Sequence, residues 1–191
     1  VRNELENFMF ANGADSLAFG SIVASGPNTA NPHAVPSDRV IEKGDFVLMD
    51  YGAGYCDYRS DMTRTVVMGE PTQEQLDLYA LVRRTHEECV AAIHPGVEGN
   101  DIFKLSKKII GDAGYGDYYN HGLGHGVGID IHEEPVLSPR NKEPLVPGNV
   151  VTVEPGIYLE GDFGMRLEDF GVVTETGFQV FTQSTHDMVI L

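Results

Sequence analysis

Apolar residues recur with helical spacing in three stretches of the chain. The first lies ahead of Asn12-Gly13, a pair that is typical of the C-terminal end of a helix. Two longer helices are predicted over about residues 72–93 and about residues 99–112. The first of these two is expected to begin at Thr72, which with Gln75 matches the pattern of a capping box, and to end before Pro95-Gly96.

Short apolar runs that lie between turn residues predict strands. These runs cover residues 19–23, 46–49, 62–68, 126–131, 150–153, 165–173 and 179–182. Loops rich in Gly, Pro, Ser and Asn separate the runs, as at Ser25-Gly26-Pro27-Asn28. The sequence therefore predicts a domain built from both helices and sheets.

Length and charge narrow the classes of protein that fit. At 191 residues the chain has the length of one domain, which could be built from two halves, and 41% of its residues are apolar. Its 13 Lys and Arg against 29 Asp and Glu give a formal net charge of −16, which argues against nucleic acid or an anionic membrane as a partner. Apolar clusters throughout the chain argue against intrinsic disorder.

The cysteines and the start of the chain bear on its cellular context. Cys56 and Cys89 are the only cysteines, so a disulfide framework and a thiolate zinc site are both excluded. This fits a reducing compartment, and the cytoplasm is the expected location. No apolar run is long enough to span a membrane, and no signal peptide opens the sequence. Because Val1 already stands within a helical pattern, we expect the chain to be a fragment of a longer protein.

An internal repeat relates the two halves of the chain at an offset of 104 residues. It aligns Lys43-Gly-Asp-Phe-Val-Leu-Met-Asp-Tyr-Gly with Pro147-Gly-Asn-Val-Val-Thr-Val-Glu-Pro-Gly, so that Asp50 falls on Glu154. Each copy has a second carboxylate downstream, Asp61 in the first and Glu168 in the second. The repeats are placed at about residues 1–70 and 88–175 of a single domain, residues 1–191. Such a repeat suggests a pseudo-twofold fold with its site on the axis.

Five side chains form the candidate site: Asp50, Asp61, His125, Glu154 and Glu168. Two of the acids end apolar strands and two lie beside strands, where an unpaired carboxylate is costly to bury. Four converging carboxylates would also repel one another by ~4 kcal/mol per close pair. Two divalent cations would balance their four charges. Oxygen ligands with one imidazole suit Mn²⁺, Co²⁺, Fe²⁺ or Zn²⁺ better than Ca²⁺, and two such ions can activate a shared water.

Three other motifs fail on inspection. His132-Glu133-Glu134-Pro135 lacks the second histidine of a zincin helix, and no Gly-x-Ser-x-Gly elbow occurs. Residues 122–128 are rich in glycine but do not match Gly-x-Gly-x-x-Gly. We expect these glycines to let backbone and substrate approach the metal ions closely.

Five segments spaced along nearly the whole chain resemble the proline-specific "pita-bread" metallopeptidases, the prolidases and Xaa-Pro aminopeptidases related to methionine aminopeptidase and creatinase. The segments are Ile22-VASGPNTANPHAVPSD, Val47-LMDYGAGYCDYRSDMTRT, Asn120-HGLGHGVGIDIHEEP, Val153-EPGIY and Arg166-LED. The resemblance implies an α+β pita-bread fold, a pseudo-twofold curved antiparallel sheet with helices on one face. It also implies a homodimeric parent protein with a separate N-terminal domain.

The resemblance further implies how five ligands would hold two ions, with Mn²⁺ or Co²⁺ favoured and Zn²⁺ or Fe²⁺ as alternatives. Asp50 would bind one ion, His125 and Glu154 the other, and Asp61 and Glu168 would bridge both. The implied substrate is a peptide with proline at its second position, cleaved at the Xaa-Pro bond by a metal-bridging hydroxide.

Further residues acquire roles by the same resemblance. His33 and His132 would flank the substrate, and His121 and Arg166 would position substrate or ligands. Glu154 would also shuttle the proton from water to the leaving nitrogen. From the residues alone, Arg166 could instead neutralise Glu168 or the neighbouring Asp169.

Two alternative functions stay open at this point. Methionine aminopeptidase would share His132-Glu133-Glu134-Pro135, but Asn31-Pro32-His33, Tyr158 and Arg166 favour the proline-specific branch. A non-catalytic binding module of the same fold would usually lack the acidic ligands, which are intact here. An inactive fragment with a formed metal site would also fit.

Overall fold

Three α-helices and thirteen short strands make up the chain in the computed structural model, which describes residues 1–191. The helices are α1 (Arg2–Ala11), α2 (Gln73–Ala92) and α3 (Gly99–Asp112), with 3₁₀ turns η1 (Gly26–Ala30) and η2 (Gly116–Tyr118). The strands of the first half are β1 (Ser16–Leu17), β2 (Ile22–Ser25), β3 (Phe46–Tyr51), β4 (Ala53–Tyr55), β5 (Tyr58–Arg59) and β6 (Met62–Val67). Those of the second half are β7 (Gly124–Gly126), β8 (Glu133–Leu137), β9 (Val150–Val153), β10 (Gly156–Tyr158), β11 (Gly164–Arg166), β12 (Asp169–Val173) and β13 (Phe178–Val180).

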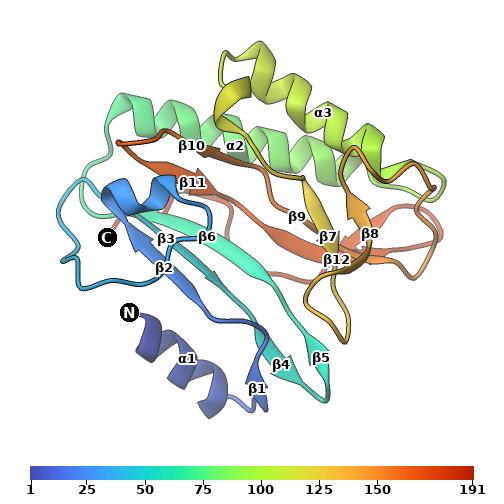
Figure 1. Cartoon of the computed structure of the whole chain (residues 1–191), viewed down its shortest axis with the longest axis horizontal. Helices are drawn as coiled ribbons and strands as arrows, with labels where there is room; N and C mark the ends of the chain where they lie inside the picture. Colours follow the sequence, from blue (N-terminus) through green and yellow to red (C-terminus); the bar gives the residue numbers. More distant parts are fainter.

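Two antiparallel sheets form the centre of the molecule (Figure 1). The first has the order β2-β3-β6, and the second has the order β13-β12-β9-β7-β8. An isolated bridge between Thr63 and Glu168 pairs the backbones of the two halves. Within the second sheet, β7-β9-β12 repeats the chain order of β2-β3-β6. This is the arrangement that the sequence repeat predicts for related halves, although the bounds of the repeat stay a prediction.

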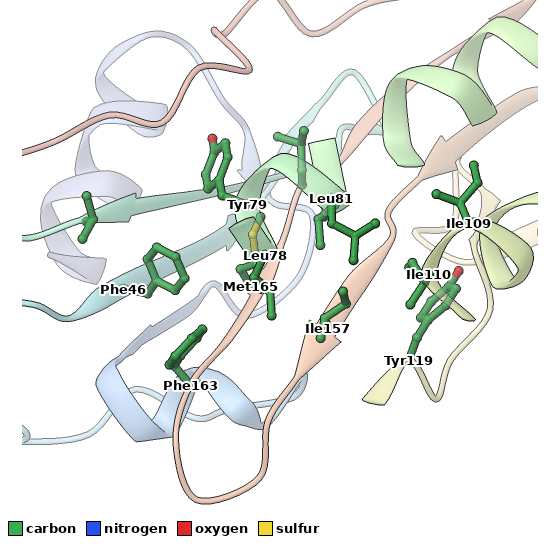
Figure 2. Packing of buried hydrophobic residues seen from close by; sticks show 13 residues of the cluster. Phe46, Leu78, Tyr79, Leu81, Ile109, Ile110, Tyr119, Ile157, Phe163 and Met165 are labelled. Atoms are coloured by element: carbon green, nitrogen blue, oxygen red, sulfur yellow. The ribbon is translucent and has the colours of Figure 1, made fainter. Parts of the chain in front are cut away.

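Helices α2 and α3 lie together over one side of the sheets, whereas α1 lies apart from them near β1 and β2 (Figure 1). The largest apolar cluster joins α2 to β3 and β11 through Phe46, Leu78 and Met165, with Ile157 of β10 beside them (Figure 2). A second apolar cluster is formed by residues of α2 and α3 together with residues of the second sheet. Helices on one face of antiparallel sheets confirm the predicted α+β class. No helix has the length and hydropathy needed to cross a membrane.

The predicted ends of α2 are confirmed in detail. The Thr72 hydroxyl accepts a 3.2 Å hydrogen bond from the Gln75 amide, and the Gln75 side-chain oxygen accepts a 2.9 Å bond from the Thr72 amide. These two bonds satisfy donors that the first turn of a helix leaves free. Helix α1 is also present, but none of its residues is buried, and Phe8 is 67% exposed. The apolar residues of α1 therefore do not form part of a buried core in this chain.

Three of the predicted strands are wrong in extent. The strand expected at residues 19–23 is β2, which begins only at Ile22 and continues to Ser25. The strand expected at residues 126–131 ends at Gly126, and the following residues form turns before β8. Strand β8 contains Pro135, which lacks an amide hydrogen, and it is tolerated because β8 is the edge strand of its sheet. The strand expected at 165–173 is two strands, β11 and β12, separated at Leu167 and Glu168. This break places Glu168 at the junction of the two sheets.

Gly124 has a structural role in addition to the one expected of the glycine-rich segment, which stays a prediction. A Cβ atom at Gly124 would lie 2.0 Å from the carbonyl oxygen of Thr152. Glycine is therefore needed at this position so that the backbones of β7 and β9 can approach each other. Through this approach, His125 on β7 comes beside the end of β9, where Glu154 follows.

Candidate metal centre

All nine site residues that the sequence predicts line one cavity of about 540 Å³. They are Asp50, Asp61, His125, Glu154 and Glu168, the predicted ligands, with His33, His121, His132 and Arg166. Strands position the five ligands: Asp50 is the penultimate residue of β3, and Asp61 immediately precedes β6. His125 is the central residue of β7, Glu154 follows β9, and Glu168 precedes β12. Residues from distant parts of the sequence therefore share one site.

The imidazole of His125 lies between two carboxylates. Its Nε2 atom is 3.5 Å from Oδ2 of Asp61 and 3.4 Å from Oε1 of Glu154. Ligand atoms of Asp61, His125 and Glu168 all lie within 4.8 Å of one another. These spacings allow one cation to contact three side chains after small movements.

The protonation state of His125 suits metal binding. Burial lowers its pKa to about 4, so the ring is neutral at pH 7. Its Nδ1 atom lies 3.0 Å from the carbonyl oxygen of Gly126, a geometry in which the Nδ1 hydrogen is donated to that oxygen. The Nε2 lone pair then points at Asp61 and Glu154. This is the arrangement that metal-ligating histidines commonly adopt.

The carboxylates of the cluster resist ionisation when no cation is near. Burial raises the pKa of Asp61 to about 9, and the negative charges of Asp50 and Glu154 act in the same direction. Burial also raises the pKa of Glu154 to about 7. The pKa of Glu168 is raised well above its ordinary value by burial and by Asp61. So much buried negative charge requires protons or cations to balance it.

Asp50 provides the clearest sign that a ligand is expected. Its Oδ2 atom accepts a 2.6 Å hydrogen bond from Nη2 of Arg166. Its Oδ1 atom is buried and has no hydrogen-bond partner. A buried carboxylate oxygen without a partner is costly, and a cation in the cavity would satisfy it. The residues present therefore fit divalent metal ions.

The sequence alone left the ion-pair partner of Arg166 open. It pairs with Asp50 rather than with Asp169, whose partner is Arg64 at 2.7 Å. Its Nε atom donates to the Thr63 hydroxyl at 3.1 Å, and that hydroxyl donates to Oε2 of Glu168 at 2.6 Å. Arg166 thus holds two carboxylates of the cluster, one directly and one through Thr63.

The other histidines lie at two depths around the cavity. His121 is joined to Arg166 through Tyr158, because Nη1 of Arg166 donates to the Tyr158 hydroxyl at 2.8 Å and that hydroxyl lies 3.1 Å from Nε2 of His121. Burial and the nearby charge of Arg166 lower the pKa of His121 to about 4, so it is neutral. His33 and His132 are exposed to solvent at the cavity wall, where a substrate can reach them. The ring of His132 lies 4.3 Å from that of His125.

Sequence reasoning missed three residues of the site. Thr63 holds Glu168, and Thr152 donates to Oε1 of Glu154 at 3.3 Å. Each threonine lies two residues from a predicted ligand, on the same face of its extended segment, and this spacing is a signal that could have found them. Arg140 lines the cavity with its side chain exposed and in no ion pair with this chain. It is therefore free to meet an anionic group of a substrate.

A fold of this kind, with buried carboxylates and a neutral imidazole around one cavity, defines a class of metal-dependent hydrolases. The family model for metallopeptidase family M24 matches residues 1–175, and the chain belongs to this family.

Relatives in sequence agree with the family. The chain is 47% identical over 191 residues to the uncharacterized peptidase YqhT of Bacillus subtilis, covering 100% of this chain and 54% of that protein. It is 42% identical over 189 residues to the Xaa-Pro dipeptidase of Pyrococcus furiosus, covering 99% of this chain and 54% of that protein. The chain thus spans about half the length of the curated relatives it matches.

Solved structures show the same fold. A prolidase from Thermococcus sibiricus superposes with a TM-score of 0.98 at 44% identity, covering 100% of this chain and 52% of that one. An Xaa-Pro dipeptidase from Bacillus anthracis gives a TM-score of 0.98 at 46% identity, covering 100% of this chain and 54% of that one. The pita-bread fold predicted from the sequence is therefore confirmed.

Proposed function

We propose that this chain is the catalytic domain of a dinuclear metallopeptidase that cleaves the bond between an N-terminal residue and a proline. The observation that carries the proposal is the cluster of five ligand side chains around one cavity, with an unpartnered buried oxygen on Asp50. The names of the Pyrococcus furiosus and Bacillus anthracis relatives support the specificity for Xaa-Pro. The parent protein is proposed to be a homodimer.

Two ions are proposed because four carboxylates carry four negative charges. Asp50 would hold one ion, His125 and Glu154 the other, and Asp61 and Glu168 would bind both. Bound divalent ions would supply a water of lowered pKa as the nucleophile and would polarise the scissile carbonyl. The donor set, rich in oxygen with one imidazole, favours Mn²⁺ or Co²⁺, with Zn²⁺ or Fe²⁺ as alternatives.

The chain's own residues supply the remaining parts of the reaction. Glu154 is proposed to take a proton from the attacking water and to pass it to the proline nitrogen, as a carboxylate beside the reacting atoms can do. His33 and His132 stand at the cavity wall and would donate to the peptide carbonyl or accept from the amine. Arg166 and His121 lie behind the ligands and would position them.

The length of peptide that the site accepts is proposed to depend on the residues at the open side of the cavity. Arg140 stands at the wall with its guanidinium unpaired within this chain. A guanidinium pairs well with a carboxylate, so Arg140 is proposed to favour a short peptide whose C-terminus lies close to the cleaved bond.

The test combines metal content with peptide hydrolysis. Protein supplied separately with Mn²⁺, Co²⁺ or Zn²⁺ is assayed by elemental analysis and on Ala-Pro, on an Ala-Pro tripeptide and on a Met-Ala peptide. We expect two ions per chain and cleavage of the Xaa-Pro bond. Preference for Met-Ala would instead assign a methionine aminopeptidase, and metal binding without hydrolysis would assign a binding module or an inactive fragment.

A matched pair of variants tests the metal centre itself. Glu168→Ala is expected to remove one or both ions together with activity, while His94→Ala, at an exposed histidine outside the cavity, keeps both. An active Glu168→Ala protein with its full metal content would refute the site.

A further inference from the structure

A second cluster of metal-ligating side chains lies behind the site described above. It consists of His86 from α2, Asp169 at the start of β12, and His186 from the segment that follows β13. Ligand atoms of the three residues lie within 4.8 Å of one another. Because consecutive residues of an extended segment point in opposite directions, Asp169 faces away from the cavity that Glu168 faces.

Asp169 uses its two oxygens for different partners. Its Oδ1 atom accepts hydrogen bonds from Nη2 of Arg64 at 2.7 Å and from the Thr182 hydroxyl at 2.5 Å. Its Oδ2 atom lies 3.3 Å from Nε2 of His86 and 2.6 Å from Nε2 of His186. Oδ2 of Asp169 therefore faces two imidazole nitrogens and no other polar partner.

His86 is the member of the cluster that the rest of the fold does not explain. Its side chain is 0% exposed, and neither ring nitrogen has a hydrogen-bond partner. A buried polar group left in this way costs ~1–3 kcal/mol. Burial lowers the pKa of His86 to about 4, so the ring is neutral and one nitrogen has a free lone pair. A cation between this histidine and Asp169 would give Nε2 the partner that it lacks.

His186 closes the cluster on the solvent side. Its ring packs edge-on against that of His86, with centroids 4.9 Å apart, and its side chain is 27% exposed. Its Nδ1 atom lies 3.8 Å from Oε1 of Glu87. When Nε2 binds a cation, the ring hydrogen moves to Nδ1, where this carboxylate can accept it.

We propose that His86, Asp169 and His186 form a zinc site separate from the catalytic centre. Two imidazole nitrogens and one carboxylate oxygen are donors that Zn²⁺ prefers, and solvent beside His186 would supply the fourth ligand. The ligand atoms of a tetrahedral zinc site lie roughly 3.3 Å apart, so the observed spacings require movements of about 1 Å. The bound ion fastens the segment after β13 to α2 and β12, directly behind Glu168.

Zinc binding measured by equilibrium dialysis tests the site, with ZnCl₂ as the probe. His125→Ala is used as the background because it weakens the catalytic centre. In that background we expect one tightly bound zinc per chain. Adding His186→Ala should weaken it by ~100-fold or more, because loss of a ligand costs at least as much as loss of a group that only orients one. Adding His94→Ala, at an exposed histidine, should change nothing.

Two outcomes would overturn the proposal. One is that adding His186→Ala leaves the zinc affinity of the background unchanged. The other is that adding His94→Ala weakens zinc binding as much as adding His186→Ala does, which would indicate adventitious surface binding only. If His186→Ala does not fold, histidine ¹⁵N spectra of the unsubstituted chain decide instead. One equivalent of zinc beyond the catalytic centre must shift the His86 and His186 resonances, and unshifted resonances contradict the site.

Discussion

The Thr63 hydroxyl donates a 2.6 Å hydrogen bond to Oε2 of Glu168, across 105 residues of sequence. The backbones of the same two residues form the isolated bridge between the halves of the molecule. The hydroxyl also accepts from Nε of Arg166 at 3.1 Å. One buried side chain thus aligns a proposed bridging ligand with the arginine that holds Asp50.

Replacing Thr63 by valine is therefore expected to weaken metal binding. Valine matches the shape of threonine but leaves Oε2 of Glu168 and Nε of Arg166 without their partner. We expect metal affinity to fall ~10- to 100-fold, as for other groups that orient ligands. Isothermal titration with Mn²⁺ measures the change, and Thr63→Ser, which keeps the hydroxyl, is the control. Wild-type affinity in Thr63→Val would show that Glu168 needs no such support.

Arg166 and Arg140 line the same cavity but differ in burial and pairing, and they form a matched pair of variants. Arg166 is 3% exposed and its guanidinium pairs with Asp50, so Arg166→Met leaves a buried carboxylate uncompensated. We expect the metal-free protein to lose ~3–5 kcal/mol of unfolding free energy. Arg140→Met should stay within ~0.5 kcal/mol of the parent, because it removes no ion pair within this chain. Urea denaturation compares the two, and equal losses would contradict the role given to Arg166.

The gathering of Asp50, Asp61, Glu154 and Glu168 at one cavity could be predicted from sequence because each of these acids lies at or beside an apolar run. Glu154 comes directly after Val150-Val151-Thr152-Val153, where a carboxylate has no reason to be buried without a partner. The hydrogen bonds that hold the ligands could not be predicted in the same way. The link from Thr63 to Glu168 depends on how the two sheets meet, and no local pattern contains that information.

The same limit explains the wrong strand at residues 126–131. The run Val127–Ile131 has apolar residues, but Gly128 and Asp130 favour turns, and the structure has no strand there. Proline is disfavoured within strands, yet the edge position of β8 accommodates Pro135. Helices were predicted better, since Thr72 and Gln75 form their cap within four residues of sequence.

Two leucines of α2 allow a direct test of the core. Leu78 is 0% exposed within the largest apolar cluster (Figure 2), whereas Leu76 is 40% exposed on the same helix. Leu78→Ala is expected to cost ~2–5 kcal/mol, because it removes buried methyl groups and leaves a cavity. Leu76→Ala should cost less than ~1 kcal/mol. Chemical denaturation measures the free energy of unfolding of both variants. A similar loss at the two positions would contradict the placement of Leu78 in the core.

The stability of the metal-free protein is expected to fall as the pH rises from about 6.5 to about 8. Burial raises the pKa of Asp61 to about 9, while the unfolded value is ~3.9. In this pH range the folded chain holds a proton on Asp61 that the unfolded chain has lost. The free energy of unfolding then falls by about 1.4 kcal/mol per pH unit for each such proton. Below about pH 6.5, His121 and His125 oppose the trend, because the unfolded chain protonates them first and their folded pKa is about 4.

Urea denaturation of chelator-treated protein across this pH range measures the slope. Asp61→Asn removes one of the titrating protons, so its slope should be shallower than that of the parent. Saturating Mn²⁺ should flatten or reverse the slope, because cations replace the protons on the carboxylates and their binding releases those protons to solvent. A stability of the metal-free protein that rises between about pH 6.5 and about pH 8 would mean that the cluster is already ionised without metal. The buried carboxylates would then need some other source of positive charge, and the argument for two cations would lose its electrostatic basis.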